Sequence, residues 1–166
     1  MGYTTEFFGQ FDCEPALPPQ LVKDINDYAG TRHFKRHCDE SKYGLEGEMY
    51  IDRDRRDILG ASTPGTERKW DTSSDPEVKS YNEPAGGCPS LWCQWVATDD
   101  GRHIEWDGSE KFYEYTDWLK WIIDKFLKPN GITLSGEVRW QGEEDSDAGK
   151  IKVAGNEITL GVVNCW

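Results

Sequence analysis

Alternation of apolar and polar residues predicts a strand near the start of the chain. Between residues 3 and 13 the side chains on one face are Tyr3, Thr5, Phe7, Phe11 and Cys13. A period of two is typical of a strand with one buried face. Gly9 interrupts the pattern, which indicates a bulge or a crossing point.

A helix is expected next, because the spacing of apolar residues changes from two to three and four. Pro18 and Pro19 suit a first helical turn, where an amide has no partner within the helix. Four apolar residues then share one helical face: Leu17, Leu21, Ile25 and Tyr28. Gly30 suits the end of this helix.

The centre of the chain predicts two strands and a second helix. Residues 91–96 alternate, Asp99-Asp100-Gly101 supplies a turn, and Ile104 and Trp106 continue an apolar face on the return strand. Asp107 then caps a helix that runs to Lys128, with Glu110 completing a capping box. The apolar face of this helix carries Phe112, Tyr115, Leu119, Ile122 and Phe126, widened by Trp118, Trp121 and Ile123.

Three strands are expected in the last part of the chain. They cover residues 132–141, 150–153 and 157–163, and Gly155-Asn156 is a two-residue turn between the last two. The first six elements then follow the order strand, helix, strand, strand, helix, strand. This order predicts an α+β fold of the ferredoxin-like type, in which two helices cover one face of an antiparallel sheet.

Two additions to that fold follow from the remaining residues. The last two strands form an extra C-terminal hairpin, and residues 39–89 form a long irregular insertion after the first helix. The length of 166 residues suits one domain with one core, so residues 1–166 are interpreted as a single α+β domain.

Net charge is the feature that most restricts function. The chain has 19 basic and 31 acidic residues, which gives −12 at pH 7. Direct binding to nucleic acid is disfavoured, because the phosphates repel such a surface and no counterions would be released. A basic protein is the expected partner.

No stretch is apolar enough for a bilayer span and the first residues lack a secretion signal, so a cytosolic location is expected.

Five irregularly spaced cysteines indicate reduced thiols. Cys88 and Cys93, with His37 and Cys38, have the residue types of a zinc site. Cys93 on an alternating strand is better interpreted as a small buried side chain, so no metal or other cofactor is expected.

Several short motifs resemble a family of small acidic proteins of unknown function found in bacterial and phage genomes. They are MGYxT at the start, LWCQW from Leu91, IEWDG from Ile104, EKFY from Glu110, WL from Trp118 and GEVxWQGE from Gly136. The resemblance implies a bacterial or phage origin and implies no activity.

The leading hypothesis is a non-enzymatic module that binds a basic protein. Trp92 and Gln94 are expected on an open sheet face opposite the helices. Acidic residues are expected around them, namely Asp99, Asp100, Glu105, Glu143, Glu144, Asp145 and Asp147. In a phage, such a module would inhibit a nucleic-acid-handling or defence protein of the host. The alternative is that this face is covered by the insertion and is ordinary core.

Other functions are weighed against this hypothesis. A small metal-dependent or nucleotide-acting enzyme would place its site under residues 39–89, using His33, His37 and His103. Acid–base catalysis by His103 with nearby carboxylates at 105, 107 and 110 is less favoured, because carboxylates at a helix start suit capping better. Residues 143–149 do not have EF-hand spacing. The basic residues 32–37 suit a solvated edge better than an anion site. A homodimer could form through the edge strand of the final hairpin or through Trp166.

Overall fold

The computed structural model describes residues 5–52, 78–109 and 112–162. The chain divides into two compact units. Unit 1 consists of residues 1–26 and 94–166, and unit 2 of residues 27–93. The Ser-, Thr- and Gly-rich part of the predicted insertion, residues 61–76, lies outside the described residues.

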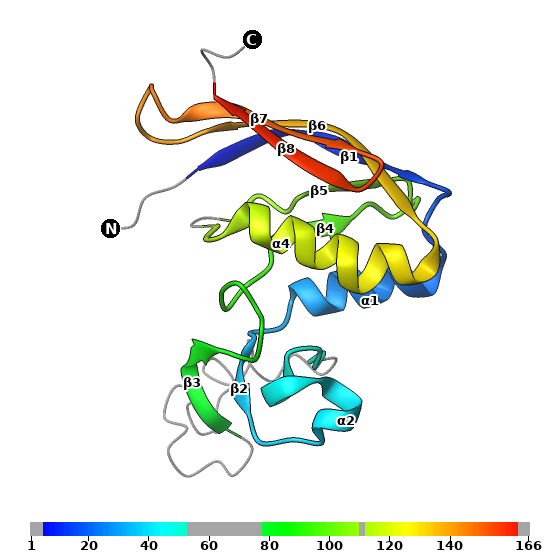
Figure 1. Ribbon diagram of the computed structural model, residues 1–166, viewed down its shortest axis with the longest axis vertical. Helices are drawn as coiled ribbons and strands as arrows, with labels where there is room; N and C mark the ends of the chain where they lie inside the picture. Colours follow the sequence, from blue (N-terminus) through cyan, green and yellow to red (C-terminus); the bar gives the residue numbers. More distant parts are fainter. Residues whose placement is uncertain (1–4, 53–77, 110–111, 163–166) are drawn as a thin grey trace, which may run out of the picture. The chain divides into compact units, whose positions relative to one another are not determined.

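Unit 1 is built on a six-stranded antiparallel sheet (Figure 1). In chain order its strands are β1 (Glu6–Glu14), β4 (Trp95–Ala97), β5 (His103–Trp106), β6 (Thr133–Gln141), β7 (Ala148–Ala154) and β8 (Glu157–Val162). Their order across the sheet is β4-β5-β1-β6-β7-β8. The first strand of the chain therefore lies in the middle of the sheet, between β5 and β6.

One face of this sheet is the core of unit 1, as the alternation predicted. Phe7, Phe11 and Cys13 of β1 are buried, whereas Phe8 on the opposite face is 53% exposed. β6 buries Leu134, Val138 and Trp140 on the same side. The pairing of β1 with β6 runs through Gly9 without a shift, so Gly9 is not a bulge.

Two helices lie on the buried face of the sheet (Figure 1). They are α1 (Pro19–Ala29), which begins in unit 1, and α4 (Tyr115–Ile122). The side chain of Asn26 in α1 binds both backbone groups of Ala97, with Nδ2 3.0 Å from the carbonyl oxygen and Oδ1 2.7 Å from the amide nitrogen. This amide pair fixes α1 against the edge strand β4.

The second predicted helix begins later than the sequence indicated. Glu114 precedes α4 with φ 57° and ψ 43°, a left-handed conformation that interrupts the helix upstream of Tyr115. Asp107 is therefore not its cap; its carboxylate accepts the Ser109 amide at 2.8 Å in a local turn. Glu110 lies outside the described residues.

The later part of this helix keeps the expected apolar face. A π-helical segment (Ile123–Leu127) and a short 3-10 segment (Lys128–Asn130) continue α4 to Gly131, whose φ is 71°. The buried residues along the whole segment are Trp118, Leu119, Ile122, Ile123, Phe126 and Leu127.

The strand predicted at residues 91–96 is shorter and starts later. β4 covers only Trp95–Ala97. It pairs antiparallel with β5, with Trp95 opposite Trp106. The C-terminal hairpin forms as predicted, with β7 and β8 joined at Gly155 and Asn156.

Unit 2 has its own small sheet and short helices. Its elements are β2 (Phe34–Arg36), α2 (Glu40–Tyr43), η1 (Leu45–Gly47) and β3 (Val78–Pro84). β2 pairs antiparallel with β3. The insertion predicted as irregular thus contains regular structure in both of its described parts, residues 39–52 and 78–89.

Two basic residues that were predicted at a solvated edge, His33 and Arg36, lie in the core of unit 2. The Arg36 guanidinium is buried, with its Cζ 3.8 Å from the ring centroid of Phe34 and 4.1 Å from that of Tyr50. His33 is 1% exposed and stacks on Tyr28 with the ring centroids 4.0 Å apart. His33, Phe34 and Arg36 are therefore buried, whereas His37 is exposed, so residues 32–37 are only in part the solvated edge that the sequence predicted.

The structure thus confirms an α+β protein with a six-stranded antiparallel sheet. Among the helices of the described residues, none has the length and apolar character needed to cross a bilayer.

The burial of His33 predicts a dependence of stability on pH. Desolvation lowers its pKa from 6.5 to about 3, against the opposing effect of its 2.8 Å hydrogen bond with the Tyr28 carbonyl. The unfolded chain takes up a proton below pH 6.5, whereas folded His33 stays neutral to about pH 3. The contribution of His33 to stability is therefore complete above pH 6.5 and is lost on acidification towards pH 3, at up to about 1.4 kcal/mol per pH unit.

We expect His33→Gln to weaken the pH dependence of the unfolding free energy between pH 7.5 and pH 5, measured by urea unfolding. His37→Gln, a change at an exposed histidine of the same segment, is the control and should retain the dependence of the parent protein. Equal pH dependence in the parent protein and in His33→Gln would contradict the conclusion that the lowered pKa of His33 contributes to this dependence.

Candidate protein-binding surface

The carboxylates predicted to surround one recognition face lie at two opposite ends of the sheet. The turn with Asp99 and Asp100 follows β4 at the end where β1 finishes, because the Cys13 amide donates to the Arg102 carbonyl at 2.7 Å. The turn with residues 143–147 follows β6 at the other end, where Glu6 pairs with Gln141. Asp12 lies six residue steps along β1 from Glu6, or roughly 20 Å.

Two predicted binding residues do not lie on an open face of unit 1. Gln94 is 6% exposed, and its Oε1 accepts the indole N–H of Trp106 at 2.9 Å. The expectation that Gln94 points to solvent is therefore wrong, because β4 begins only after it. Trp92 is half-buried and belongs to unit 2.

The turn between β6 and β7 presents acidic side chains on a well-fixed backbone. The side-chain Nε2 of Gln141 donates to the Gly142 carbonyl oxygen at 3.0 Å and to that of Glu144 at 3.1 Å. The Trp140 indole N–H donates to Oδ1 of Asp147 at 3.0 Å. Glu143, Glu144 and Asp145 are exposed at the tip.

A cluster of aromatic rings supports this end of the sheet from the core side. The Phe7 ring lies edge-on to four others, at centroid distances of 5.4 Å to Trp95, 5.3 Å to Trp106, 5.8 Å to Phe112 and 4.9 Å to Tyr115. Tyr115 in turn lies 6.1 Å from Trp140. The start of α4, the start of β1 and the end of β6 are thereby held together.

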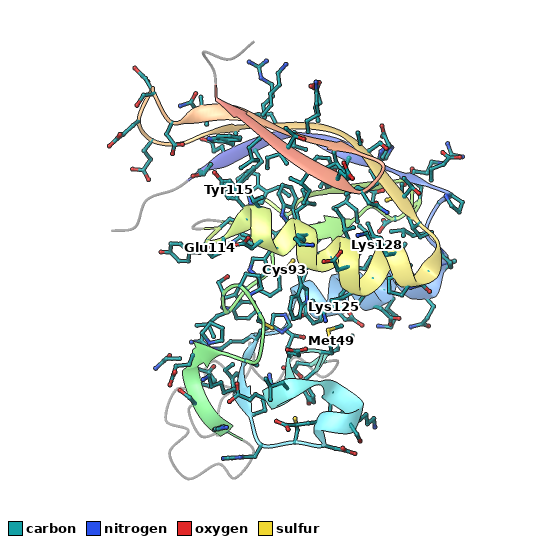
Figure 2. The ribbon with its side chains drawn as sticks, viewed as in Figure 1. Met49, Cys93, Glu114, Tyr115, Lys125 and Lys128 are labelled. Carbon is teal, nitrogen blue, oxygen red and sulfur yellow. The ribbon has the colours of Figure 1, made fainter. Side chains whose placement is uncertain are left out.

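The start of α4 adds two more carboxylates to the same end. Glu114 and Tyr115 lie at the first turn of this helix, whereas Lys125 and Lys128 lie on its later part (Figure 2). A hydrogen bond between the carboxyl groups of Glu114 and Asp117 raises the pKa of Glu114. Both side chains are exposed, and Tyr113 beside them is 58% exposed.

These observations define one surface, which we call the acidic end. It consists of Glu6, Asp107, Glu114, Asp117, Glu143, Glu144, Asp145 and Asp147. Figure 1 shows its parts on one side of unit 1: the start of β1, the start of α4 and the turn between β6 and β7. The cations Arg139 and Lys150 face each other two pairs further into the sheet.

The sheet face opposite the helices is open and mixed in charge. Gln10 Nε2 donates to Glu105 at 2.8 Å, and His103 Nδ1 lies 2.9 Å from Oδ1 of Asp12. Glu137 lies 3.9 Å from Lys150 and 3.8 Å from Lys152. Glu105 and His103, considered for acid–base catalysis, are thus paired with other polar groups on the outer face.

The turn at residues 99–101, at the opposite end of the sheet from the acidic end, has a structural role. The Thr98 hydroxyl at 2.6 Å and the Arg102 amide at 3.0 Å hold the pKa of Asp100 below its ordinary value. Gly101 follows with φ 73°, and a Cβ there would lie 2.4 Å from the Leu17 carbonyl oxygen. Asp100 therefore stabilises a turn that closes against the segment before α1.

Cys88, one of the predicted metal ligands, is engaged in other contacts. No group of three or more metal-ligating side chains occurs in residues 5–52, 78–109 and 112–162. The Cys88 thiol lies 3.6 Å from the Tyr28 hydroxyl and 3.5 Å from the Glu48 carbonyl. The four described cysteines are thiols rather than disulfides, and burial raises the pKa of Cys13 to about 12. Cys165 lies outside the described residues.

Four residues of the acidic end were missed by sequence reasoning as part of a binding surface. They are Glu6, Asp107, Glu114 and Asp117. Their sequence positions are far apart. The pairing of β1 with β6 and the ring contacts of Tyr115 bring Glu6, Glu114 and Asp117 near residues 143–147. The pairing of β5 with β1 and the contact of Trp106 with Phe7 place Asp107 at the same end. The strict alternation of β1 could have placed Glu6 on the polar face, although not at this end.

The chain matches no protein-family model, and neither curated proteins nor solved structures show a significant similarity to it.

The hydrogen bond from Trp140 to Asp147 generates a test of how this turn is held. Asp147→Ala removes the acceptor and should lower the free energy of unfolding by about 1–2 kcal/mol. Asp147→Asn keeps a carbonyl oxygen for the indole N–H and should cost less than half as much. Denaturant unfolding followed by tryptophan fluorescence measures both. Equal losses in the two variants would show that the charge of Asp147, and not this hydrogen bond, stabilises the turn.

Proposed function

We propose that this protein is a non-enzymatic binding module whose acidic end docks on a basic protein. The observation that carries the proposal is the gathering of eight carboxylates around one end of the unit 1 sheet, on a backbone fixed by Gln141, Trp140 and Phe7. A fixed cluster of like charges is complementary to a surface rich in Lys and Arg.

The distribution of charge between the units supports this surface. Residues 1–26 and 94–166 contain 18 acidic and 9 basic residues, whereas residues 27–93 contain 13 and 10. The negative charge is therefore concentrated in unit 1. The pKa of Glu114 is raised first by its hydrogen bond with the Asp117 carboxyl group and also by repulsion from the charge of Asp117. A cationic side chain from a partner would relieve that repulsion.

We also infer that β1, α1, β4, β5, α4 and β6 form a ferredoxin-like unit. The strand order β4-β5-β1-β6 and the antiparallel pairing of each neighbouring pair support this inference. β7 and β8 extend the sheet as the additional hairpin. In such a unit the helices occupy one face, so a protein partner has access to the strand ends and to the outer face.

The charge and the surface together suggest the class of partner. A nucleic-acid-handling protein carries basic surface for phosphate groups, and an acidic protein competes for that surface. In the cytosol of an infected bacterium, this competition would inhibit a host defence or housekeeping complex. The competing hypothesis, an enzyme with its site under residues 39–89, is less favoured, because His33 is enclosed in the core of unit 2 and Glu46 is paired with Lys79 at 2.9 Å.

The decisive experiment compares two double charge-reversal variants that change the net charge by the same amount. Immobilised full-length protein is exposed to a bacterial extract, and retained proteins are identified at about 50 mM and about 500 mM salt. We expect a basic protein that is retained at low salt and released at high salt. Glu143→Lys with Asp145→Lys, at the acidic end, should reduce its retention about tenfold or more.

The matched control is Glu14→Lys with Glu157→Lys. It changes the net charge of unit 1 by the same amount at two exposed positions, one at the far end of β1 and one at the start of β8. It should retain the partner. An acidic partner, retention that ignores salt, or equal loss in both variants would contradict the proposal, as would tight binding of the parent protein to duplex DNA.

A further inference from the structure

The two edges of the unit 1 sheet differ in how they are protected. The edge strand β4 has only three residues, and both backbone groups of its Ala97 are bound by the Asn26 side chain. Pairing with another chain is therefore blocked at that edge. The opposite edge is β8, which has six residues and pairs with β7 along its whole length without a register shift.

The backbone of β8 offers a row of hydrogen-bonding groups along its outer edge. Ala154 and Glu157 flank the two-residue turn at Gly155 and Asn156 and form the first pair of the hairpin. In such a hairpin this first pair exchanges hydrogen bonds, and bonded pairs alternate along the ladder. Thr159 therefore bonds towards β7, whereas the N–H and C=O groups of Ile158 and Leu160 point away from it.

Side chains that usually protect an exposed edge are missing from β8. Its sequence is EITLGV, which contains no Pro, Lys or Arg, and its pairing with β7 contains no bulge. Leu160 is 51% exposed, one of the few large apolar side chains of the described residues with such exposure. Ile158 lies beside it on the same face of the strand. Among the described strands none pairs with this edge of β8, and a ladder edge with an apolar stripe accepts another strand.

We propose that β8 pairs with β8 of a second copy of this chain, so that two unit 1 sheets join into one antiparallel sheet. The argument for a second copy is self-complementarity. With Thr159 opposite the partner's Thr159, Ile158 lies opposite the partner's Leu160, and Glu157 lies opposite the partner's Gly161. The two Glu157 carboxylates, the only charges in the strands, are then roughly 13 Å apart along the ladder.

The response to salt distinguishes this dimer from binding to a basic partner. One strand from each copy gives an interface smaller than the roughly 800 Å² per partner of stable complexes, so the dimer forms at high protein concentration. Each copy carries a net charge of −12, and the copies repel one another. Added salt therefore strengthens the dimer, whereas it weakens attraction to a basic protein.

The test is sedimentation velocity of the full chain over a range of concentrations at low and high salt. We expect a monomer–dimer equilibrium that shifts towards dimer as salt increases. Leu160→Lys places a charge on the free edge and should raise the dissociation constant at least about tenfold. Phe8→Lys is the control, because Phe8 is similarly exposed on the same sheet, on the central strand β1, and should leave the dimer unchanged.

A second variant tests the backbone row itself. Leu160→Pro removes an amide that points away from β7, so the hairpin tolerates it while the dimer is lost. Far-ultraviolet circular dichroism confirms that each variant is folded. A monomeric parent protein at every concentration and salt, a dimer that persists in both Leu160 variants, or equal loss in Phe8→Lys would overturn the proposal. Because the acidic end is not involved, Glu143→Lys with Asp145→Lys should dimerise at least as well as the parent protein.

Discussion

Packing of aromatic rings around Phe7 is the constraint on which unit 1 depends. Phe7 contacts rings from β4, β5 and the segment leading into α4, and Trp95 adds a hydrogen bond from its indole N–H to the Tyr115 carbonyl at 2.8 Å. Large rings bury much area at low cost in side-chain entropy, which compensates for the small number of aliphatic residues. The same cluster fixes where the carboxylates of the acidic end stand.

The part of the fold that could be read from the sequence is the part governed by local periodicity. The alternation in β1 and β6 and the helical spacing from Phe112 to Phe126 correctly identified most of the buried residues, since each depends only on the geometry of its own element. Tyr115 and Trp121 are only half-buried, and the buried Leu127 was not expected. The start of α4 could not be read in this way. Asp107 has the chemistry of a cap, but the left-handed conformation of Glu114 begins the helix seven residues later.

The acidic character of the candidate site could be predicted from the sequence, but its position on the sheet could not. The acidic residues at 143–147 were expected at an exposed turn, and the structure has them there. Which other carboxylates join them depends on strand register, which sets the end of the sheet that each turn occupies. Gln94 illustrates the same limit, because a strand that begins four residues later than predicted turns an expected surface amide into the buried acceptor of Trp106.

The order of segments in unit 1 has a consequence for biosynthesis. β1 is made first, yet its neighbours β5 and β6 come from beyond unit 2, with Phe11 paired to Ile104 and Glu6 paired to Gln141. At translation rates of about 5–20 residues per second, β1 waits roughly 7–27 s for its last partner to be made. During that interval Phe7 and Phe11 lack the neighbouring strands against which they pack in the folded protein. Placing unit 2 between the halves of unit 1 thus prolongs the least protected stage in the life of the protein.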